Sequence, residues 1–243
     1  MNDVTFTILE NRKIGEGIYA MRCADPDPVP PRPGQFVNLS LPGFFLRRPI
    51  SVCDYEDGVI TLVYKVVGEG TALMARLQPG TELMALTNLG NGFDLSRAGT
   101  KPLLLGGGMG VAPLYLLAKG LIARGAVPTV VVGFANAGAA MLIDEFKALG
   151  CPVIVMSDDG SIGKKGFVTG PMAELEYSYY YTCGPAPMFR AVHKAAAGEG
   201  ESSLEERMGC GFGACMGCTI DTNRGPKRVC KDGPVFPGGD LKW

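Results

Sequence analysis

The fold of this chain is decided by Leu103-Leu104-Leu105-Gly106-Gly107-Gly108-Met109-Gly110-Val111-Ala112-Pro113. The leucines predict a short buried strand, the glycines a tight turn, and the proline the first turn of a helix over residues 113–124. In such a strand–turn–helix unit, backbone N–H groups and the helix N-terminus can bind a pyrophosphate. We therefore predict a nucleotide phosphate site, with a ligand-free tight turn as the alternative, at Gly106, Gly107, Gly108 and Gly110.

Strands and helices continue to alternate on the C-terminal side of this unit. Apolar strands are predicted at residues 129–133, 152–157 and 179–183, and helices at residues 141–149 and 187–197. This alternation predicts a doubly wound parallel sheet, which binds ligands at the carboxyl ends of its strands. Cys183 ends the last strand, so we predict that it lies beside a nicotinamide; a packing thiol is the alternative.

The loop after the second strand of this sheet indicates which nucleotide is bound. Residues 133–138 contain no Arg or Lys, and a 2′-phosphate normally requires such a cation. We therefore predict NAD(H) rather than NADP(H). No Asp or Glu ends the second strand, and Asp158-Asp159-Gly160 is predicted to be a turn rather than a metal site.

The first 97 residues have a different pattern, typical of β structure. Short apolar runs at residues 4–9, 18–23, 35–41, 60–67 and 82–87 are separated by turn signals rich in Pro, Gly and Asp. Many short strands of this kind predict a closed antiparallel barrel, interrupted by one helix at residues 71–76. The fold class is therefore α/β plus all-β.

The barrel half also contains a candidate cofactor site. In Arg47-Arg48-Pro49-Ile50-Ser51, the proline fixes the backbone, Arg48 can bridge phosphate oxygens, and Ser51 can offer a hydroxyl. An aromatic edge, a cation and a Gly-opened helix start follow at Val63-Tyr64-Lys65 and Gly70-Thr71. These are the parts needed to hold a flavin ring and its diphosphate.

The C-terminal tail carries cysteines spaced C-x4-C-x2-C-x11-C, namely Cys210, Cys215, Cys218 and Cys230. This spacing is typical of the ligands of a plant-type [2Fe–2S] cluster, and the glycines between the first three let the backbone approach the cluster. A zinc site usually has two close pairs of cysteines, and a disulfide needs an oxidising compartment. The sequence therefore favours an iron–sulfur cluster over these two alternatives.

Composition and charge limit the remaining possibilities. The chain is 47% apolar and 19% charged, with a formal net charge of −1 and no long run of Lys or Arg, so we expect neither nucleic acid nor an anionic membrane as a partner. The N-terminus lacks the pattern of a signal peptide, and no apolar run is long enough for a membrane span. We expect a cytoplasmic protein with domains at residues 1–98 (FAD), 99–200 (NAD) and 201–243 (cluster).

Taken together, the motifs resemble a known family. Arg-Pro-x-Ser, Gly-Gly-Gly-x-Gly-x-Ala-Pro and Cys-Gly-Pro resemble the ferredoxin-reductase superfamily, and residues 204–218 and 227–236 resemble the electron-transfer subunit of NAD-linked bacterial dihydroorotate dehydrogenase. The resemblance implies FAD in the barrel, NAD on the sheet and a [2Fe–2S] cluster in the tail. It places the flavin contacts at Arg48, Pro49, Ile50, Ser51, Val63, Tyr64, Lys65, Gly70 and Thr71, and the cluster ligands at Cys210, Cys215, Cys218 and Cys230.

The resemblance also implies a partner and a role in pyrimidine biosynthesis. An FMN-containing catalytic subunit would oxidise dihydroorotate, in a heterotetramer of two plus two subunits, and this chain would pass the electrons to NAD⁺. Consistent with this division, the sequence suggests no acid–base catalyst of its own: the single histidine, His193, lies on a predicted helix beside Lys194. The alternative is a related reductase subunit that serves a ferredoxin, sulfide or hydrogenase partner.

Overall fold

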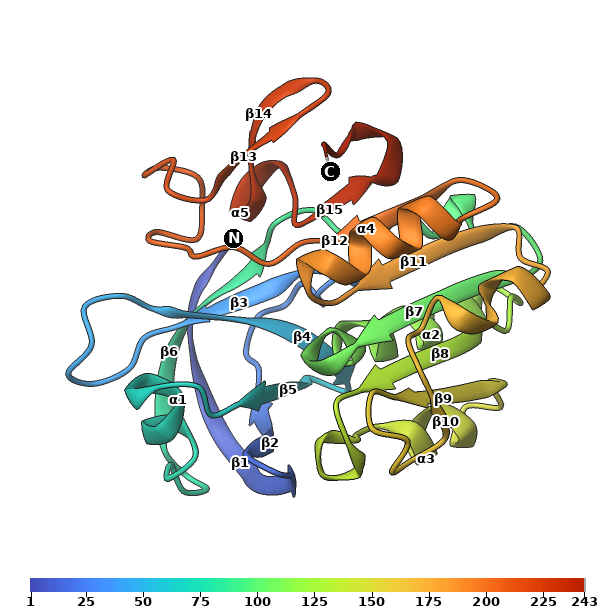
Figure 1. The fold of residues 1–243 in the computed structure, drawn as a ribbon. Coiled ribbons are helices and arrows are strands. Elements are labelled where there is room, and N and C mark those ends of the chain that lie inside the picture. The colour runs from blue at the N-terminus through green and yellow to red at the C-terminus, as the bar shows by residue number, and fades with distance from the viewer. Residues whose placement is uncertain (243) are drawn as a thin grey trace.

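The computed structural model describes residues 1–242 and contains a barrel, a sheet and a smaller C-terminal lobe (Figure 1). The barrel is closed and antiparallel, with the strand order β1-β2-β5-β4-β3-β6. Its strands are β1 (Asp3–Gly15), β2 (Ile18–Ala24), β3 (Phe36–Leu39), β4 (Arg48–Glu56), β5 (Val59–Lys65) and β6 (Glu82–Leu89), and α1 (Glu69–Met74) connects the last two. The predicted antiparallel barrel is confirmed.

The barrel differs from the prediction at β4, which the sequence did not indicate as a strand. Proline lacks an N–H and is normally found at strand edges, and arginines are not typical of a buried strand. In the structure Pro49 pairs with Asn38 of β3, whereas the opposite edge of β4 is unpaired at this point. The missing N–H of Pro49 is therefore tolerated, because the edge of β4 that faces β5 makes no strand pairing at this residue.

The second layer is a sheet with the strand order β10-β9-β8-β7-β11-β12-β15. Its strands are β7 (Pro102–Gly107), β8 (Thr129–Phe134), β9 (Val153–Ser157), β10 (Lys164–Lys165), β11 (Tyr179–Cys183), β12 (Gly200–Ser203) and β15 (Val235–Pro237). All pairs are parallel except β12 with β15. The order runs outward from β7 in both directions, so the predicted doubly wound topology is confirmed.

Helices cover both faces of the sheet. Adjacent residues of a strand point to opposite faces, and because both sets are apolar in β7, each face needs a helix to bury it. Leu104 packs in one core with α2 (Pro113–Ala123) and α3 (Ile143–Ala148), whereas Leu103 and Leu105 pack in another with α4 (Ala186–Ala195). Barrel residues such as Ile18 and Val63 join the first core. Lys119 of α2 also forms an ion pair with Asp54 of β4 at 2.7 Å, so barrel and sheet are fixed against each other.

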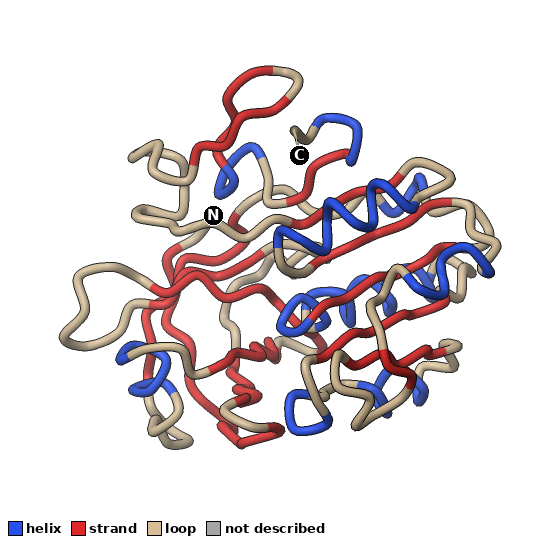
Figure 2. Tube along the Cα trace, viewed as in Figure 1, coloured by secondary structure: helices blue, strands red, loops and turns tan. Residues whose placement is uncertain are grey.

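The C-terminal lobe, which we call the cluster lobe (residues 204–234), leaves the sheet after β12 and returns to it as β15. It contains the hairpin of β13 (Thr219–Thr222) and β14 (Gly225–Arg228), the short helix α5 (Val229–Asp232), and otherwise loops (Figure 2). The sequence predicts that the nucleotide-binding domain ends at residue 200. Gly200 begins β12, where the ring of Tyr180 fills the space that a side chain would need. The sheet thus continues past the predicted domain boundary at residue 200.

No helix within residues 1–242 is long and apolar enough to cross a membrane.

Candidate functional site

The first part of the site is a cavity of about 340 Å³, the barrel cavity, which opens where β4 and β5 separate. The two strands pair from Val52–Leu62 to Glu56–Val59, next to the hairpin turn that connects them. Beyond this point their edges part, with residues 48–51 on one side and residues 63–65 on the other. The cavity is lined by Phe36, Arg48, Pro49, Ile50, Ser51, Val63, Tyr64, Lys65, Val67, Thr71, Met109, Ala112, Leu204, Glu205, Glu206, Met208 and Pro234.

Two of the predicted flavin residues form a rigid wall of the barrel cavity. The guanidinium of Arg48 lies over the Phe44 ring, with its central carbon 4.6 Å from the ring centroid. It also lies against Gly70, where a Cβ would overlap it. Gly70 itself does not line the cavity but leaves room for this arginine. Thr71 fixes the start of α1, because its hydroxyl accepts hydrogen bonds from the N–H groups of Val67 (2.9 Å) and Gly68 (3.2 Å).

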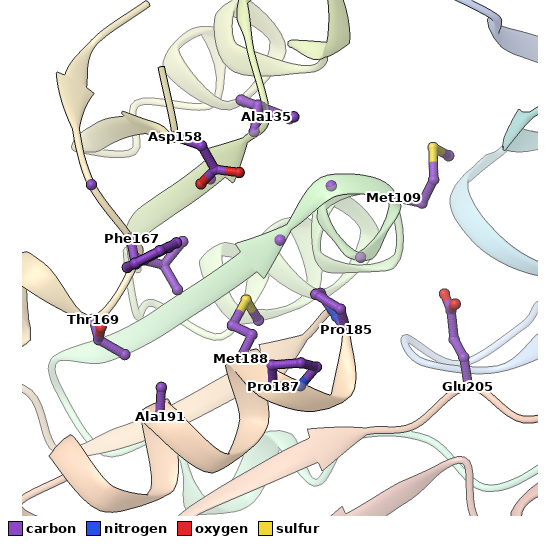
Figure 3. Close-up of a pocket in the computed structure, with 18 residues that line it drawn as sticks. Met109, Ala135, Asp158, Phe167, Thr169, Pro185, Pro187, Met188, Ala191 and Glu205 are labelled. Carbon is purple, nitrogen blue, oxygen red and sulfur yellow. The ribbon is translucent and has the colours of Figure 1, made fainter. Parts of the chain in front are cut away.

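The second part of the site is a cavity of about 590 Å³, the sheet cavity, at the carboxyl ends of the strands around β7. Strand order reverses here, between β7 and β11, which is where open α/β sheets bind ligands. The cavity is lined by Gly107, Gly108, Met109, Gly110, Gly133, Phe134, Ala135, Asp158, Gly166, Phe167, Val168, Thr169, Gly184, Pro185, Pro187, Met188, Ala191 and Glu205 (Figure 3).

The glycines predicted to bind phosphate have different positions. Gly107, Gly108 and Gly110 line the sheet cavity, directly before the N-terminus of α2. Gly106 does not line it; this residue lies in β7, packed against Val111. Gly110 touches the backbone carbonyl of Cys183, and any Cβ there would overlap that carbonyl. The turn that is predicted to bind phosphate is therefore packed tightly against the end of β11.

The sheet cavity is mostly apolar, and its charged lining residues are two acids. Asp158 lies beside Ala135 at one end and Glu205 lies near Met109 at the other, as Figure 3 shows. The protein atoms packed around Glu205 raise its pKa above the usual value, although the side chain is exposed to solvent. Asp158, Phe167 and Glu205 were not predicted from the sequence as site residues.

The two cavities share part of their lining. Met109 and Glu205 belong to both, so molecules bound in the two cavities would approach each other there. Cys183 lies close by but is 1% exposed and lines neither cavity. Burial, and then the nearby carboxylate of Glu205, raise the pKa of its thiol, so it is neutral. Its position beside a nicotinamide stays a prediction.

The cysteines of the cluster lobe lie in two pairs. Sγ of Cys210 accepts hydrogen bonds from the N–H groups of Ala214 (3.2 Å) and Cys215 (3.4 Å), and its thiol contacts that of Cys215. Sγ of Cys218 accepts one from the N–H of Cys230 at 3.4 Å, and these two thiols also contact each other. The first pair is at the surface, whereas Cys218 and Cys230 are buried.

This arrangement suits a two-iron cluster better than a single metal ion. No group of three or more His, Cys, Asp or Glu side chains within residues 1–242 is placed to hold one ion. In a [2Fe–2S] cluster with four cysteine ligands, each iron takes two of them, which matches the two pairs. Burial would raise the pKa of Cys210, but backbone hydrogen bonds from Cys215 and Phe212 lower it to about 6, which favours the thiolate. The cysteines thus fit the cluster that the spacing predicts.

The cluster lobe borders the barrel cavity. Phe36 lines this cavity and also packs in one apolar core with Cys218 and Cys230. Met208 and Pro234, at the two ends of the lobe, line the cavity as well. Asn38 of β3 donates a hydrogen bond to the carbonyl of Cys210 at 3.0 Å, which fixes the cysteine loop to the barrel.

A barrel joined to a doubly wound sheet, with cavities that meet at their junction, defines the ferredoxin-reductase-like fold. A solved chain of an NADH-dependent reduced ferredoxin–NADP oxidoreductase has the same arrangement, with a TM-score of 0.88 and 30% identity over 98% of this chain and 90% of that chain. Residues 205–242 match the family model described as the iron–sulfur cluster binding domain of dihydroorotate dehydrogenase B.

Two curated relatives extend the similarity to nearly the whole chain. The electron transfer subunit of dihydroorotate dehydrogenase B (NAD(+)) from Fusobacterium nucleatum is 39% identical, over 97% of both chains. The subunit of the same description from Bacillus caldolyticus is 44% identical over 86% of both. The chain belongs to the family of dihydroorotate dehydrogenase B (NAD(+)) electron transfer subunits.

Proposed function

We propose that this chain accepts electrons from a separate dihydroorotate-oxidising subunit and delivers them to NAD⁺ through a [2Fe–2S] cluster and FAD. The observation that carries the proposal is the order of the three sites. The barrel cavity borders the cluster lobe through Phe36 and shares Met109 and Glu205 with the sheet cavity. A group in the barrel cavity therefore lies between the other two.

In this proposal the barrel cavity holds FAD. Arg48 binds the diphosphate, while the unpaired edges of β4 and β5 offer backbone groups to the flavin ring from Pro49, Ile50, Ser51, Val63, Tyr64 and Lys65. Gly70 makes room for Arg48, and Thr71 holds the start of α1 in place. The sheet cavity holds NAD(H), with its pyrophosphate at Gly107, Gly108 and Gly110, and Cys183 lies beneath the nicotinamide end.

Cys210, Cys215, Cys218 and Cys230 would hold the cluster, which would supply one-electron transfer, and the barrel cavity would hold the flavin, which would supply both one-electron and hydride transfer. The protein contributes position and exclusion of water rather than acid–base chemistry. Phe36 lines the barrel cavity and packs in one apolar core with the buried cysteine pair, so it lies between them. Met109 lines both cavities at their junction.

The catalytic partner in this proposal carries FMN and assembles with this chain as two plus two subunits in the cytoplasm, within pyrimidine biosynthesis. The surface around the exposed cysteine pair supports docking there, because Phe212 and Met216 are 42% and 54% exposed. A ferredoxin, sulfide or hydrogenase partner is not favoured, since the curated relatives are named as subunits of dihydroorotate dehydrogenase.

The division of labour is tested by turnover with and without the catalytic subunit. The isolated holoprotein should pass electrons from NADH to an artificial acceptor but should not oxidise dihydroorotate, which requires a positioned base near a flavin. Substantial dihydroorotate oxidation by this chain alone would contradict the proposal. A Phe212→Asp variant should assemble poorly with the partner, and normal assembly would place the docking surface elsewhere.

The cluster ligands are tested by cysteine replacement. Cys218→Ser should lose iron and the EPR signal of the reduced cluster. Cys53→Ser provides the matched control, because Cys53 is equally buried but packs in the core shared by barrel and sheet. Full iron content in Cys218→Ser, or loss of iron in Cys53→Ser, would contradict the assignment.

A further inference from the structure

We infer that Asp158 selects NAD(H) over NADP(H) by accepting a hydrogen bond from the 2′-hydroxyl of the adenosine ribose. The inference rests on the proposed function, because it requires NAD(H) in the sheet cavity. Asp158 lies at the end of β9, the third strand of the sheet along the chain.

The position of Asp158 follows from the sheet. It comes directly after β9, and its backbone N–H donates to the carbonyl of Phe134 at the end of β8, at 3.0 Å. Asp158 therefore lies beside Ala135, on the strand next to the one where the dinucleotide fingerprint normally has its acid. Figure 3 shows its carboxylate next to Ala135.

The direction of the bound dinucleotide follows from the junction of the cavities. The nicotinamide must lie near Met109 and Glu205, since only there do the barrel and sheet cavities meet. The phosphates belong at the glycine turn before α2. The adenosine half then extends to the opposite end, where Asp158 and the exposed ring of Phe167 line the cavity.

Charge at this end opposes a 2′-phosphate. The sheet cavity is lined by no Lys or Arg, so the carboxylate of Asp158 has no cation between it and the ligand. Lys164 and Lys165 of β10 pair with Met156 and Ser157 of β9, but both lysines are exposed and neither lines the cavity. A 2′-phosphate would therefore meet an anion, whereas a 2′-hydroxyl would meet a hydrogen-bond acceptor.

The neighbouring Asp159 stabilises the turn instead of facing the cavity, so its variant is a control for Asp158. Its Oδ1 accepts hydrogen bonds from the N–H and hydroxyl of Ser161, at 2.9 and 2.7 Å, and so holds the turn. The hydroxyl of Ser161 in turn accepts one from the N–H of Ala137 at 2.8 Å. Asp159 does not line the cavity. The turn is thus fixed without the carboxylate of Asp158, which is left for the ligand.

The test is an equilibrium titration of the oxidised holoprotein with NAD⁺, NADP⁺ and 2′-deoxy-NAD⁺. Asp158→Ala should weaken NAD⁺ binding roughly tenfold or more, the scale of a hydrogen bond to a charged group, and should strengthen NADP⁺ binding. It should leave 2′-deoxy-NAD⁺ affinity nearly unchanged. Asp158→Asn should keep part of the NAD⁺ affinity while also gaining NADP⁺, and Asp159→Asn should bind all three like the wild type.

Each outcome has one meaning. FAD and iron content report whether a variant is folded, and Asp158→Asn, which conserves shape, serves if Asp158→Ala is not. An unchanged ratio of NAD⁺ to NADP⁺ affinity in a folded Asp158 variant would overturn the inference, as would an equal change in Asp159→Asn. Failure of the wild type to bind NAD⁺ at all would instead overturn the proposed function.

Discussion

The barrel cavity and the sheet cavity lie side by side but differ in charge. The first has two cations, Arg48 and Lys65, besides Glu205 and Glu206 in its lining, and the second has two acids and no cation. Both would bind a molecule with a diphosphate. In one cavity an arginine can neutralise this group, and in the other only backbone N–H groups and a helix N-terminus can do so.

This difference matches the lifetimes that the two ligands need. A cofactor that stays through many turnovers gains from a charged hydrogen bond, which slows its release. A substrate that must leave after each turnover is better held by weaker dipoles and by contacts with an apolar wall. The charge pattern therefore separates a resident cofactor from an exchanging substrate.

The largest expected effect concerns Arg48. Arg48→Ala should weaken FAD binding by about tenfold to a hundredfold, because a charged hydrogen bond contributes about 1.5–3 kcal/mol. FAD content after gel filtration measures this. Arg47→Ala is the matched control, since Arg47 faces the carbonyl of Asn38 and the carboxylate of Asp3 instead. Equal loss of FAD in both variants would contradict the prediction that Arg48, and not Arg47, binds the diphosphate of FAD.

The second prediction concerns the sheet cavity alone. A Cβ on Gly110 would overlap the carbonyl of Cys183. The backbone would have to shift to make room for it, and such overpacking destabilises a protein by about 1–3 kcal/mol. Gly110→Ala should therefore bind NAD⁺ roughly tenfold more weakly and keep its FAD. Gly198→Ala, where a Cβ has open space, should change neither. Loss of FAD from Gly110→Ala would show that the cavities do not behave separately.

The third prediction is a smaller effect: the affinities for FAD and NAD⁺ should depend differently on ionic strength. Salt screens the attraction between Arg48 and a diphosphate, so FAD affinity should fall a few-fold between low and high salt. NAD⁺ affinity should change less, because no side-chain cation faces it. Fluorescence titrations at several salt concentrations measure both slopes. Equal slopes would contradict the charge difference between the cavities.

The smallest expected effect is spectroscopic and concerns the residue that both cavities share. Burial raises the pKa of Glu205, so its carboxylate takes up a proton at a higher pH than an ordinary glutamate does. As the pH falls through this raised pKa, a negative charge beside the flavin disappears and the visible flavin spectrum should shift slightly. Glu205→Gln should lack this shift and Glu206→Gln should retain it. A shift that persists in Glu205→Gln would belong to another group.

The barrel and the core of the sheet could be predicted from the sequence because their strands are apolar and end at turn signals. β12 could not, because Gly200-Glu201-Ser202-Ser203 is polar and resembles a linker. In the structure this strand is buried by its neighbours, and Oε2 of Glu201 accepts a hydrogen bond from the N–H of Asp94 at 3.0 Å. Such burial depends on tertiary contacts that local composition does not encode.

The flavin segments of the candidate site were predicted from local motifs, and most of them line one cavity. Asp158 was missed as a site residue because Asp-Asp-Gly is a typical turn sequence. The turn alone accounts for these residues, so nothing in the sequence indicated a second role for Asp158. Its second role depends on the order of strands, which places the end of β9 beside Ala135. Glu205 was missed because its position depends on where the two cavities meet in the folded chain.

The return of the chain from β12 to β15 has a consequence for protein engineering. The N–H of Leu204 donates to the carbonyl of Pro234 at 2.9 Å, so both ends of the cluster lobe are held together at the edge of the sheet. Because the ends are already closed, changing the length between them costs little: about 0.6 kcal/mol for each doubling of a flexible loop. This edge is therefore a position where the lobe can change in length, as long as its contacts with Phe36 and Asn38 of the barrel are kept.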